Sequence, residues 1–142
     1  MTDPAPDGPP QLDLDALLAS MPFAVGCGIE LLSAGPAEVR GRLGWAPERC
    51  TVGGALHGGA LMALADTVGA VCAYLNLPAG AGTTTVESGT HFLRAVRTGS
   101  VTAESRPLHA GRTLVVVQTD LYDDEGRRVA QVTQSQAVLA SR

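Results

Sequence analysis

Aromatic residues are scarce in this sequence, at 4% of the chain. Proteins that bind single-stranded nucleic acid without sequence preference stack the bases on aromatic side chains, so this class of protein is disfavoured. The chain also lacks a long basic run and carries a formal net charge of -4. Because nonspecific binding to nucleic acid depends on neutralising phosphates, the charge supports the same conclusion. We therefore expect no nucleic-acid partner.

Cysteine is also rare, and Cys27, Cys50 and Cys72 include no pair at CxxC spacing. An odd number of cysteines without paired spacing indicates reduced thiols rather than a disulfide framework. Neither the cysteines nor the histidines show metal-ligand spacing, so we expect no bound metal. A nucleophilic pair of Cys50 and His57 is a minor alternative, because an isolated cysteine is usually a small buried hydrophobe.

The N-terminus lacks the features of a signal peptide. Residues 1–11 are acidic and proline-rich, whereas a signal peptide begins with basic residues followed by an apolar stretch. We expect residues 1–11 to be a disordered tail and residues 12–142 to be a single domain of a cytoplasmic protein. A chain of 142 residues that is 45% hydrophobic is long enough to bury one core.

The pattern of apolar residues predicts an α+β fold with one dominant helix. A short amphipathic helix is expected over residues 12–21, and Pro22 ends it or begins the next turn. Residues 45–54 contain Pro47 and two glycines and are expected to form a loop. Alternating or β-branched segments predict six strands, over residues 28–33, 37–43, 83–95, 100–108, 113–122 and 127–139.

The dominant helix is expected over residues 60–75, which are almost entirely apolar and include Asp66 as their only charged residue. A membrane span is disfavoured by this central aspartate and by the flanking glycines. A helix that is apolar on all sides is instead buried at the centre of a protein. Since one antiparallel sheet covers only one side of it, the remaining surface predicts an oligomer. The order of elements is that of a hotdog fold, in which a curved antiparallel sheet wraps around one long helix.

The loop before this helix ends in His57-Gly58-Gly59. Glycine lets the backbone approach a ligand closely, and the first N–H groups of a helix have no partner within it. A carbonyl oxygen placed there would be polarised, increasingly so as it becomes an oxyanion during acyl transfer. Asp66 lies roughly 10 Å further along the helix axis than these glycines. Asp66 could therefore reach the polarised carbonyl group only if two subunits paired their helices antiparallel.

His57-Gly58-Gly59, with Asp66 nine residues after the histidine, resembles the signature of the PaaI-like branch of hotdog thioesterases. Gly54 matches a glycine of that signature, and the similarity extends over about residues 25–140. The resemblance implies an acyl-CoA substrate and no cofactor. It also implies a homo-oligomer, either a dimer or a homotetramer built from two dimers, with active sites at the subunit interface.

The resemblance assigns roles to individual residues. The Gly58 N–H would polarise the thioester carbonyl, and Asp66 of the facing subunit would activate water or attack the carbonyl directly. Thr85 takes the place of a hydroxyl residue that positions the water. His57 is expected to be neutral and orienting, with an acid/base role as the alternative. Thr51 stands where the family usually has asparagine or glutamine, so its contact with the substrate would differ.

Further residues are candidates for binding. Gly54 and Gly59 are expected to contact the substrate. Arg94 and Arg97 could bind the phosphates of CoA, since guanidinium matches phosphate geometry, or could be solvated charges. Glu87 could be a second carboxylate of the site, because regular alternation places it on the same face as Thr85. The two other histidines are expected to pack or to lie at the surface, namely His91 and His109.

Two other classes of hotdog protein stay open. The substitution at Thr51 favours a noncatalytic protein that binds or senses acyl-CoA. A dehydratase is disfavoured, because those enzymes place the histidine differently and often follow it with proline, whereas two glycines follow His57 here.

Overall fold

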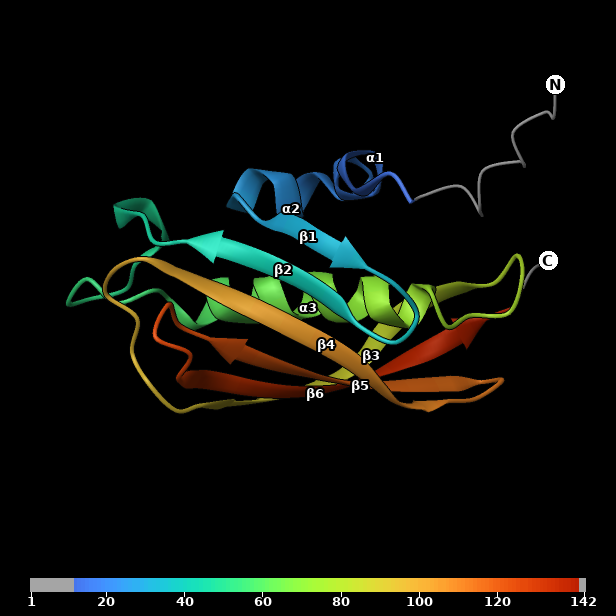
Figure 1. Ribbon diagram of the computed structural model, residues 1–142. Coiled ribbons are helices and arrows are strands. Elements are labelled where there is room, and N and C mark those ends of the chain that lie inside the picture. The colour runs from blue at the N-terminus through green and yellow to red at the C-terminus, as the bar shows by residue number, and fades with distance from the viewer. Residues whose placement is uncertain (1–11, 141–142) are drawn as a thin grey trace, which may run out of the picture.

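The computed structural model describes residues 12–140, whose strands form one antiparallel sheet curved around a long helix (Figure 1). The strands lie in the order β1-β2-β4-β5-β6-β3. This is the predicted hotdog fold; the tail predicted over residues 1–11 lies outside the described residues. The elements in chain order are α1 (Leu14–Ala19), α2 (Pro22–Cys27), β1 (Glu30–Ala34), β2 (Val39–Gly44), the 3-10 helix η1 (Pro47–Arg49), α3 (Gly58–Tyr74), β3 (Gly82–Phe92), β4 (Ser100–Ala110), β5 (Leu114–Tyr122) and β6 (Arg128–Leu139).

The N-terminal segment forms two short helices where one was predicted. Asp13 caps α1 by accepting a hydrogen bond from the Ala16 N–H at 3.1 Å. Pro22 occupies the start of α2, where its missing N–H is not needed and its fixed φ suits a helix. Gly28 then ends α2 with φ of 82°, a left-handed conformation that glycine adopts readily.

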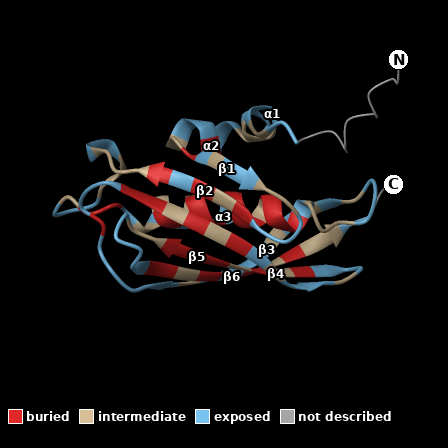
Figure 2. Cartoon of the chain, in the orientation of Figure 1, coloured by how far each residue is buried: buried red, intermediate tan, exposed pale blue. Residues whose placement is uncertain are grey.

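Helix α3 provides the centre of the core (Figure 2). It packs against the inner faces of the strands, which present small and branched apolar side chains. The helix is not covered on all sides, because Met62 is 41% exposed and Asp66, one turn further along, is exposed as well. Among the described residues, no helix is both long enough and apolar enough to cross a membrane.

Strand β3 lies at one edge of the sheet and pairs with β6 through an irregular register. Thr85 pairs with Gln136, whereas Glu87 pairs with Ser135, so Val86 is an extra residue that forms a bulge. Paired residues of an antiparallel ladder share a face, so the bulge turns Glu87 to the face opposite Thr85. The prediction that Glu87 shares a face with Thr85 is therefore wrong.

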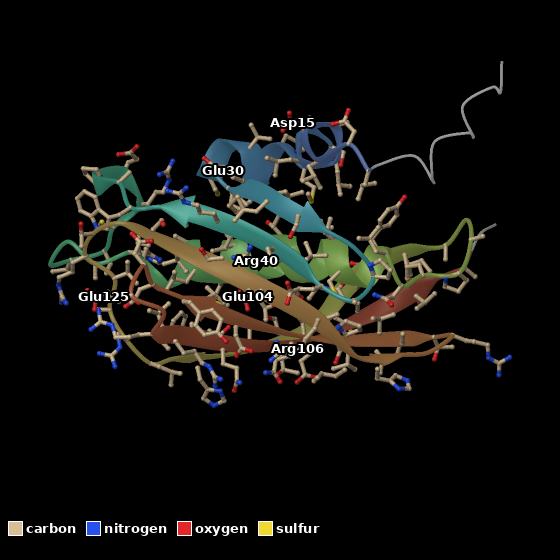
Figure 3. The ribbon with its side chains drawn as sticks, viewed as in Figure 1. Asp15, Glu30, Arg40, Glu104, Arg106 and Glu125 are labelled. Atoms are coloured by element: carbon tan, nitrogen blue, oxygen red, sulfur yellow. The ribbon has the colours of Figure 1, made fainter. Side chains whose placement is uncertain are left out.

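The outer face of the sheet carries most of the ion pairs. Arg40 and Glu104, on neighbouring strands, lie 3.5 Å apart (Figure 3). Arg106 donates a hydrogen bond of 2.8 Å to Asp120, whose side chain is fully buried on this face. The Gln131 amide also donates to Asp120, at 3.2 Å. This outer carboxylate is surrounded by donors on its own face.

Candidate active site

Asp66 projects from the middle of α3 toward the strands at the β3 edge of the sheet. Its Oδ1 atom accepts two hydrogen bonds, one from the Thr85 hydroxyl at 2.8 Å and one from the Gln134 amide at 2.7 Å. No described residue donates to Oδ2, and the side chain is exposed. One carboxylate oxygen is thus fixed by the fold, while the other is available to a reacting molecule.

The Thr85 hydroxyl is itself held in place by a hydrogen bond from strand β6. The Gln136 amide donates to the Thr85 hydroxyl oxygen at 2.6 Å, so the hydroxyl proton is directed to Asp66. The Thr83 hydroxyl donates to the Ala137 backbone carbonyl at 2.9 Å and lies 3.3 Å from the side-chain oxygen of Gln136. The hydrogen bonds therefore run in one direction, from the buried face of the sheet to the exposed carboxylate.

The two glutamines of β6 were not predicted as site residues. They lie in the same phase of the strand as Val132 and Val138, so both point from the sheet toward α3. The signal was present in the sequence: Gln134 and Gln136 occupy the apolar phase of an otherwise alternating strand. Polar residues at inward positions of a strand require hydrogen-bonding partners, which here include the site itself.

The start of α3 presents a free backbone donor. His57 is the N-cap of the helix, and its Nδ1 atom accepts a hydrogen bond from the Gly59 N–H at 2.7 Å. Because Nδ1 accepts, it carries no proton in this arrangement. The Gly59 N–H is therefore occupied, whereas the Gly58 N–H has no acceptor among the described residues. Of the two glycines, Gly58 offers its N–H to a ligand.

Phe92, another residue that the sequence did not indicate, packs beside Gly58. A Cβ atom at position 58 would lie 3.1 Å from the Phe92 ring, so glycine gives the ring room to approach. Both residues line a cavity of about 390 Å³ together with Arg94 and Leu93. The cavity connects the helix N-terminus to the end of β3.

The structure separates the two arginines that were predicted together. Arg94 lies in the cavity with Gly58, whereas Arg97 lies in a smaller hollow beside the acidic turn that includes Asp123 and Asp124. Both side chains are exposed, and neither forms an ion pair with a described residue. The position of Arg94 suits an anionic ligand of this cavity better than that of Arg97.

Thr51 and Gly54 belong to a tight loop that precedes α3. The Thr51 N–H donates to the Ala55 carbonyl at 2.8 Å, and Gly54 adopts φ of 77°. The indole N–H of Trp45 donates to the Gly54 carbonyl at 2.9 Å, which anchors the loop. The Thr51 side chain is exposed and has no hydrogen bond with a described residue.

His57 and Gly59 also line a second cavity, of about 390 Å³, between α2 and the start of α3. Cys27 and Cys50 contribute to its wall, and all three cysteines of the chain are free thiols. The Cys50 thiol donates to the Ala46 carbonyl at 3.3 Å. Burial raises the pKa of the Cys72 thiol, and a hydrogen bond with Ser105 only partly offsets this.

The free Gly58 N–H and the Asp66 carboxylate lie on the same helix but far apart along it. Gly58 and Asp66 are eight residues apart on α3, which corresponds to roughly 12 Å along the axis. A carbonyl group polarised by Gly58 is therefore beyond the reach of Asp66 in the same chain. Within residues 12–140, no group of three His, Cys, Asp or Glu side chains is placed to hold a metal ion.

Comparison with known proteins identifies the class to which this fold and site belong. The family model described as the thioesterase superfamily matches residues 53–130, and the chain belongs to that family. The proofreading thioesterase EntH of Cronobacter sakazakii is 38% identical over 86 residues, which cover 61% of this chain and 63% of that protein. A putative esterase of Deinococcus radiodurans is 36% identical over 141 residues, which cover 87% and 84% of the two chains.

Solved structures agree with this assignment. A thioesterase of Haemophilus influenzae superimposes with a TM-score of 0.85 at 28% identity, over 92% of both chains. The PaaI protein of E. coli, at 20% identity, has the same fold, with a TM-score of 0.81 over 89% of this chain and 91% of that one. The protein is thus a PaaI-like hotdog thioesterase, an enzyme that hydrolyses thioesters.

Proposed function

We propose that this thioesterase hydrolyses acyl-CoA to the free acid and CoA, with Asp66 as general base or nucleophile. The observation that carries the proposal is the asymmetry of the Asp66 carboxylate. Thr85 and Gln134 both donate to Oδ1, whereas Oδ2 has no donor among the described residues. A carboxylate held in this way presents a single basic oxygen in a fixed direction.

In the general-base route, Oδ2 of Asp66 takes a proton from water as the water oxygen attacks the thioester carbon. The negative charge that develops on the carbonyl oxygen is stabilised by the Gly58 N–H at the positive end of α3. The tetrahedral intermediate then collapses, the C–S bond breaks, and the proton passes from Asp66 to the departing thiolate. In the nucleophilic route, Oδ2 attacks the carbonyl carbon, the C–S bond breaks, and the CoA thiolate leaves and takes a proton from solvent, so that an anhydride with Asp66 remains. Water then hydrolyses the anhydride, which releases the free acid and regenerates the Asp66 carboxylate.

Both routes need the Gly58 N–H and Asp66 at one substrate carbonyl, so we propose that two subunits share each site. An antiparallel pair of α3 helices brings Gly58 of one copy to Asp66 of the other. Strand β3 supports this arrangement, because it is an eleven-residue edge strand with unpaired backbone groups along one side. Met62 and Val86, both exposed, would be covered in such a dimer. A homotetramer of two such dimers is compatible with the same site.

We further propose that the substrate carries CoA, with Arg94 close to its phosphates. The cavity that contains Gly58 also contains Arg94, and guanidinium groups bind phosphate well. A solved thioesterase of Streptococcus pneumoniae with coenzyme A has this fold, at 23% identity and a TM-score of 0.78. Neither reaction route calls for a metal or a cofactor. The free thiols favour a reducing, cytoplasmic setting.

Subunit complementation tests the shared site. Asp66→Asn removes the basic oxygen. Gly58→Pro removes the N–H at the first helical position, where the backbone tolerates proline, and the exposed Phe92 ring must shift slightly to accept the added Cβ atom. Each variant alone should be inactive toward acyl-CoA. Co-expressed chains should recover about one quarter of wild-type turnover, because half of randomly formed dimers are mixed and each has one intact site of two. Failure of the mixture to gain activity, with mixed dimers shown by mass spectrometry, would exclude a site shared in this way.

A noncatalytic acyl-CoA-binding protein is the second candidate, and Thr51 is the observation that favours it. A threonine lacks the amide group that the family usually places at this position. Thiol release from a panel of short, medium, long and aryl-acetyl CoA esters separates the two candidates. Turnover that disappears in Asp66→Asn supports the enzyme; binding of every ester without turnover supports the binding protein.

A further inference from the structure

Two glutamines that the reaction does not itself require lie fully buried behind Asp66. Gln134 is 1% exposed and Gln136 is 0% exposed, and both lie between strand β6 and helix α3. An amide in an apolar core lowers stability unless its polar atoms find partners. The preceding inward position of the strand carries Val132, which is equally buried, so the fold accepts an apolar residue at this depth.

The partners of the two amides lead to the same carboxylate oxygen. Gln134 donates directly to Asp66 Oδ1 at 2.7 Å. Gln136 donates to the Thr85 hydroxyl at 2.6 Å, and Thr85 donates to the same Oδ1 at 2.8 Å. An amide nitrogen only donates, so these bonds cannot reverse direction.

Burial of the Gln134 amide also lowers the stability of the fold, a cost that packing alone does not explain. Its Oε1 atom is buried and has no hydrogen-bond partner among the described residues. This oxygen lies against α3 at Gly69, where an added Cβ atom would be only 1.6 Å from it. The helix therefore has a glycine at the point where Gln134 needs space, although glycine is a poor helix former.

We propose that Gln134 and Gln136 are positioning residues for the thioesterase reaction and that Gly69 makes room for Gln134. Gln134 directly, and Gln136 through Thr85, fix Oδ1 of Asp66 so that Oδ2 alone meets the substrate. This inference rests on the proposed function of Asp66. The two glutamines act through Asp66 and do not touch the thioester themselves.

The first test replaces the Gln134 amide by a side chain of similar length. Gln134→Met keeps the volume and removes the donor, and it should lower kcat about tenfold to a hundredfold with little change in KM. Gln131→Met is the matched control, because Gln131 lies on the same strand and donates to Asp120 on the outer face. The control should keep the wild-type kcat. A loss of folded protein alone would lower the active fraction of enzyme, which titration of bound substrate analogue measures separately.

A double-mutant cycle with Gly69 remains informative even if Gln134→Met folds poorly. Gly69→Ala alone should displace Gln134 and lower kcat by about the same factor as Gln134→Ala alone. In the Gln134→Ala background, Gly69→Ala should leave kcat unchanged, since the new methyl group enters the space that Gln134 vacates and next meets Val117, at 3.3 Å. Multiplicative losses of kcat in the double variant would show that Gly69 does not act through Gln134 and would overturn that part of the inference.

Asp66→Asn, measured beside these variants, distinguishes failure of the proposed role of Asp66 from failure of the proposed role of Gln134. An inactive Asp66→Asn with Gln134→Met within twofold of the wild-type kcat overturns the positioning role and keeps Asp66 as the reacting group. A fully active Asp66→Asn overturns the proposed function and, with it, this inference. An inactive Asp66→Asn with a Gln134→Met enzyme of low kcat and unchanged KM supports both.

Discussion

The Thr85 hydroxyl donates a hydrogen bond to Asp66 Oδ1 across 2.8 Å and thereby joins the edge strand β3 to the central helix α3. Thr85 is fixed by the register of β3 against β6, and Asp66 is fixed by the packing of α3 into the curve of the sheet. The orientation of the carboxylate therefore depends on how well two separate elements are held.

Asp66→Asn should lower turnover by about a hundredfold to ten-thousandfold, the range typical of losing a general base. The amide retains an oxygen that accepts from Thr85 and Gln134, so the fold should persist, but its nitrogen cannot take a proton from water. Steady-state thiol release measures the loss. Asp15→Asn, at an exposed position of α1, is the control and should behave like the wild type. A near-normal rate in Asp66→Asn would remove Asp66 from the reaction.

Thr85→Ala should lower turnover less, about tenfold, because it removes one hydrogen bond to a charged group and leaves the carboxylate in place. Thr85→Ser keeps the hydroxyl and should restore most of the rate. The neighbouring Thr84 faces the other side of the strand and is exposed, so Thr84→Ala is the matched control. Equal rates for Thr85→Ala and Thr84→Ala would show that the hydroxyl is not needed.

Thr51→Asn should leave turnover unchanged or raise it, because it supplies the amide that the resemblance to PaaI-like thioesterases implies at this position. The exposed side chain has room for the longer residue, and the backbone hydrogen bond from Thr51 to Ala55 is retained. The kcat/KM for the preferred acyl-CoA is the quantity to compare. Val52→Asn, at a position that is 96% exposed, controls for adding an amide to the loop. A large loss in Thr51→Asn alone would show that the threonine has a role of its own.

Arg94→Gln should raise KM for acyl-CoA several-fold and leave kcat nearly unchanged, since it removes a positive charge from the cavity that contains Gly58. Arg97→Gln should have a smaller effect, because Arg97 lies beside the acidic turn in a separate hollow. Repeating the measurement with an acyl-pantetheine, which lacks the nucleotide, should abolish the difference. Equal KM values for the two variants would argue against a distinct role for Arg94.

Asp123→Asn should change how stability depends on pH. Burial alone would raise the pKa of the Asp123 carboxyl, but hydrogen bonds from the Arg127 backbone and side chain and from the Glu125 N–H hold it below its ordinary value of 3.8. A lowered pKa in the folded state stabilises the protein above the ordinary value, and this contribution disappears as pH falls through the folded pKa. The Tm of the wild type should therefore exceed that of Asp123→Asn at neutral pH, and the gap should shrink below 3.8. A gap that stays constant with pH would contradict this account.

The main elements of the fold could be predicted from the sequence because they rest on apolar periodicity. The six strands and the helix α3 follow from such patterns, which burial of the core enforces. Short helices and turns were harder to predict from the sequence, because they depend on local backbone conformation and not on apolar periodicity. Pro22 proved to start a helix, and η1 lies within a segment predicted as loop. The bulge at Val86 depends on pairing with β6, which strict alternation within one strand cannot reveal.

The candidate site was predictable where it follows a local motif and not where it depends on tertiary contact. His57, Gly58 and Asp66 lie on one short segment, and the structure places all three at or along α3. Gln134 reaches Asp66 from 68 residues further along the chain, so no local pattern connects them. Phe92 reaches Gly58 in the same way, through packing between the end of β3 and the start of α3.

Trp45, whose indole N–H donates to the Gly54 carbonyl, is the only tryptophan in the sequence. The protein therefore carries a single indole fluorophore, attached by a hydrogen bond to the loop that leads into α3. Any ligand that shifts this loop changes the polarity and hydrogen bonding around one indole. Binding of a substrate that moves this loop can consequently be followed by fluorescence in stopped-flow experiments on the unlabelled wild-type enzyme, without the overlapping signals of other tryptophans.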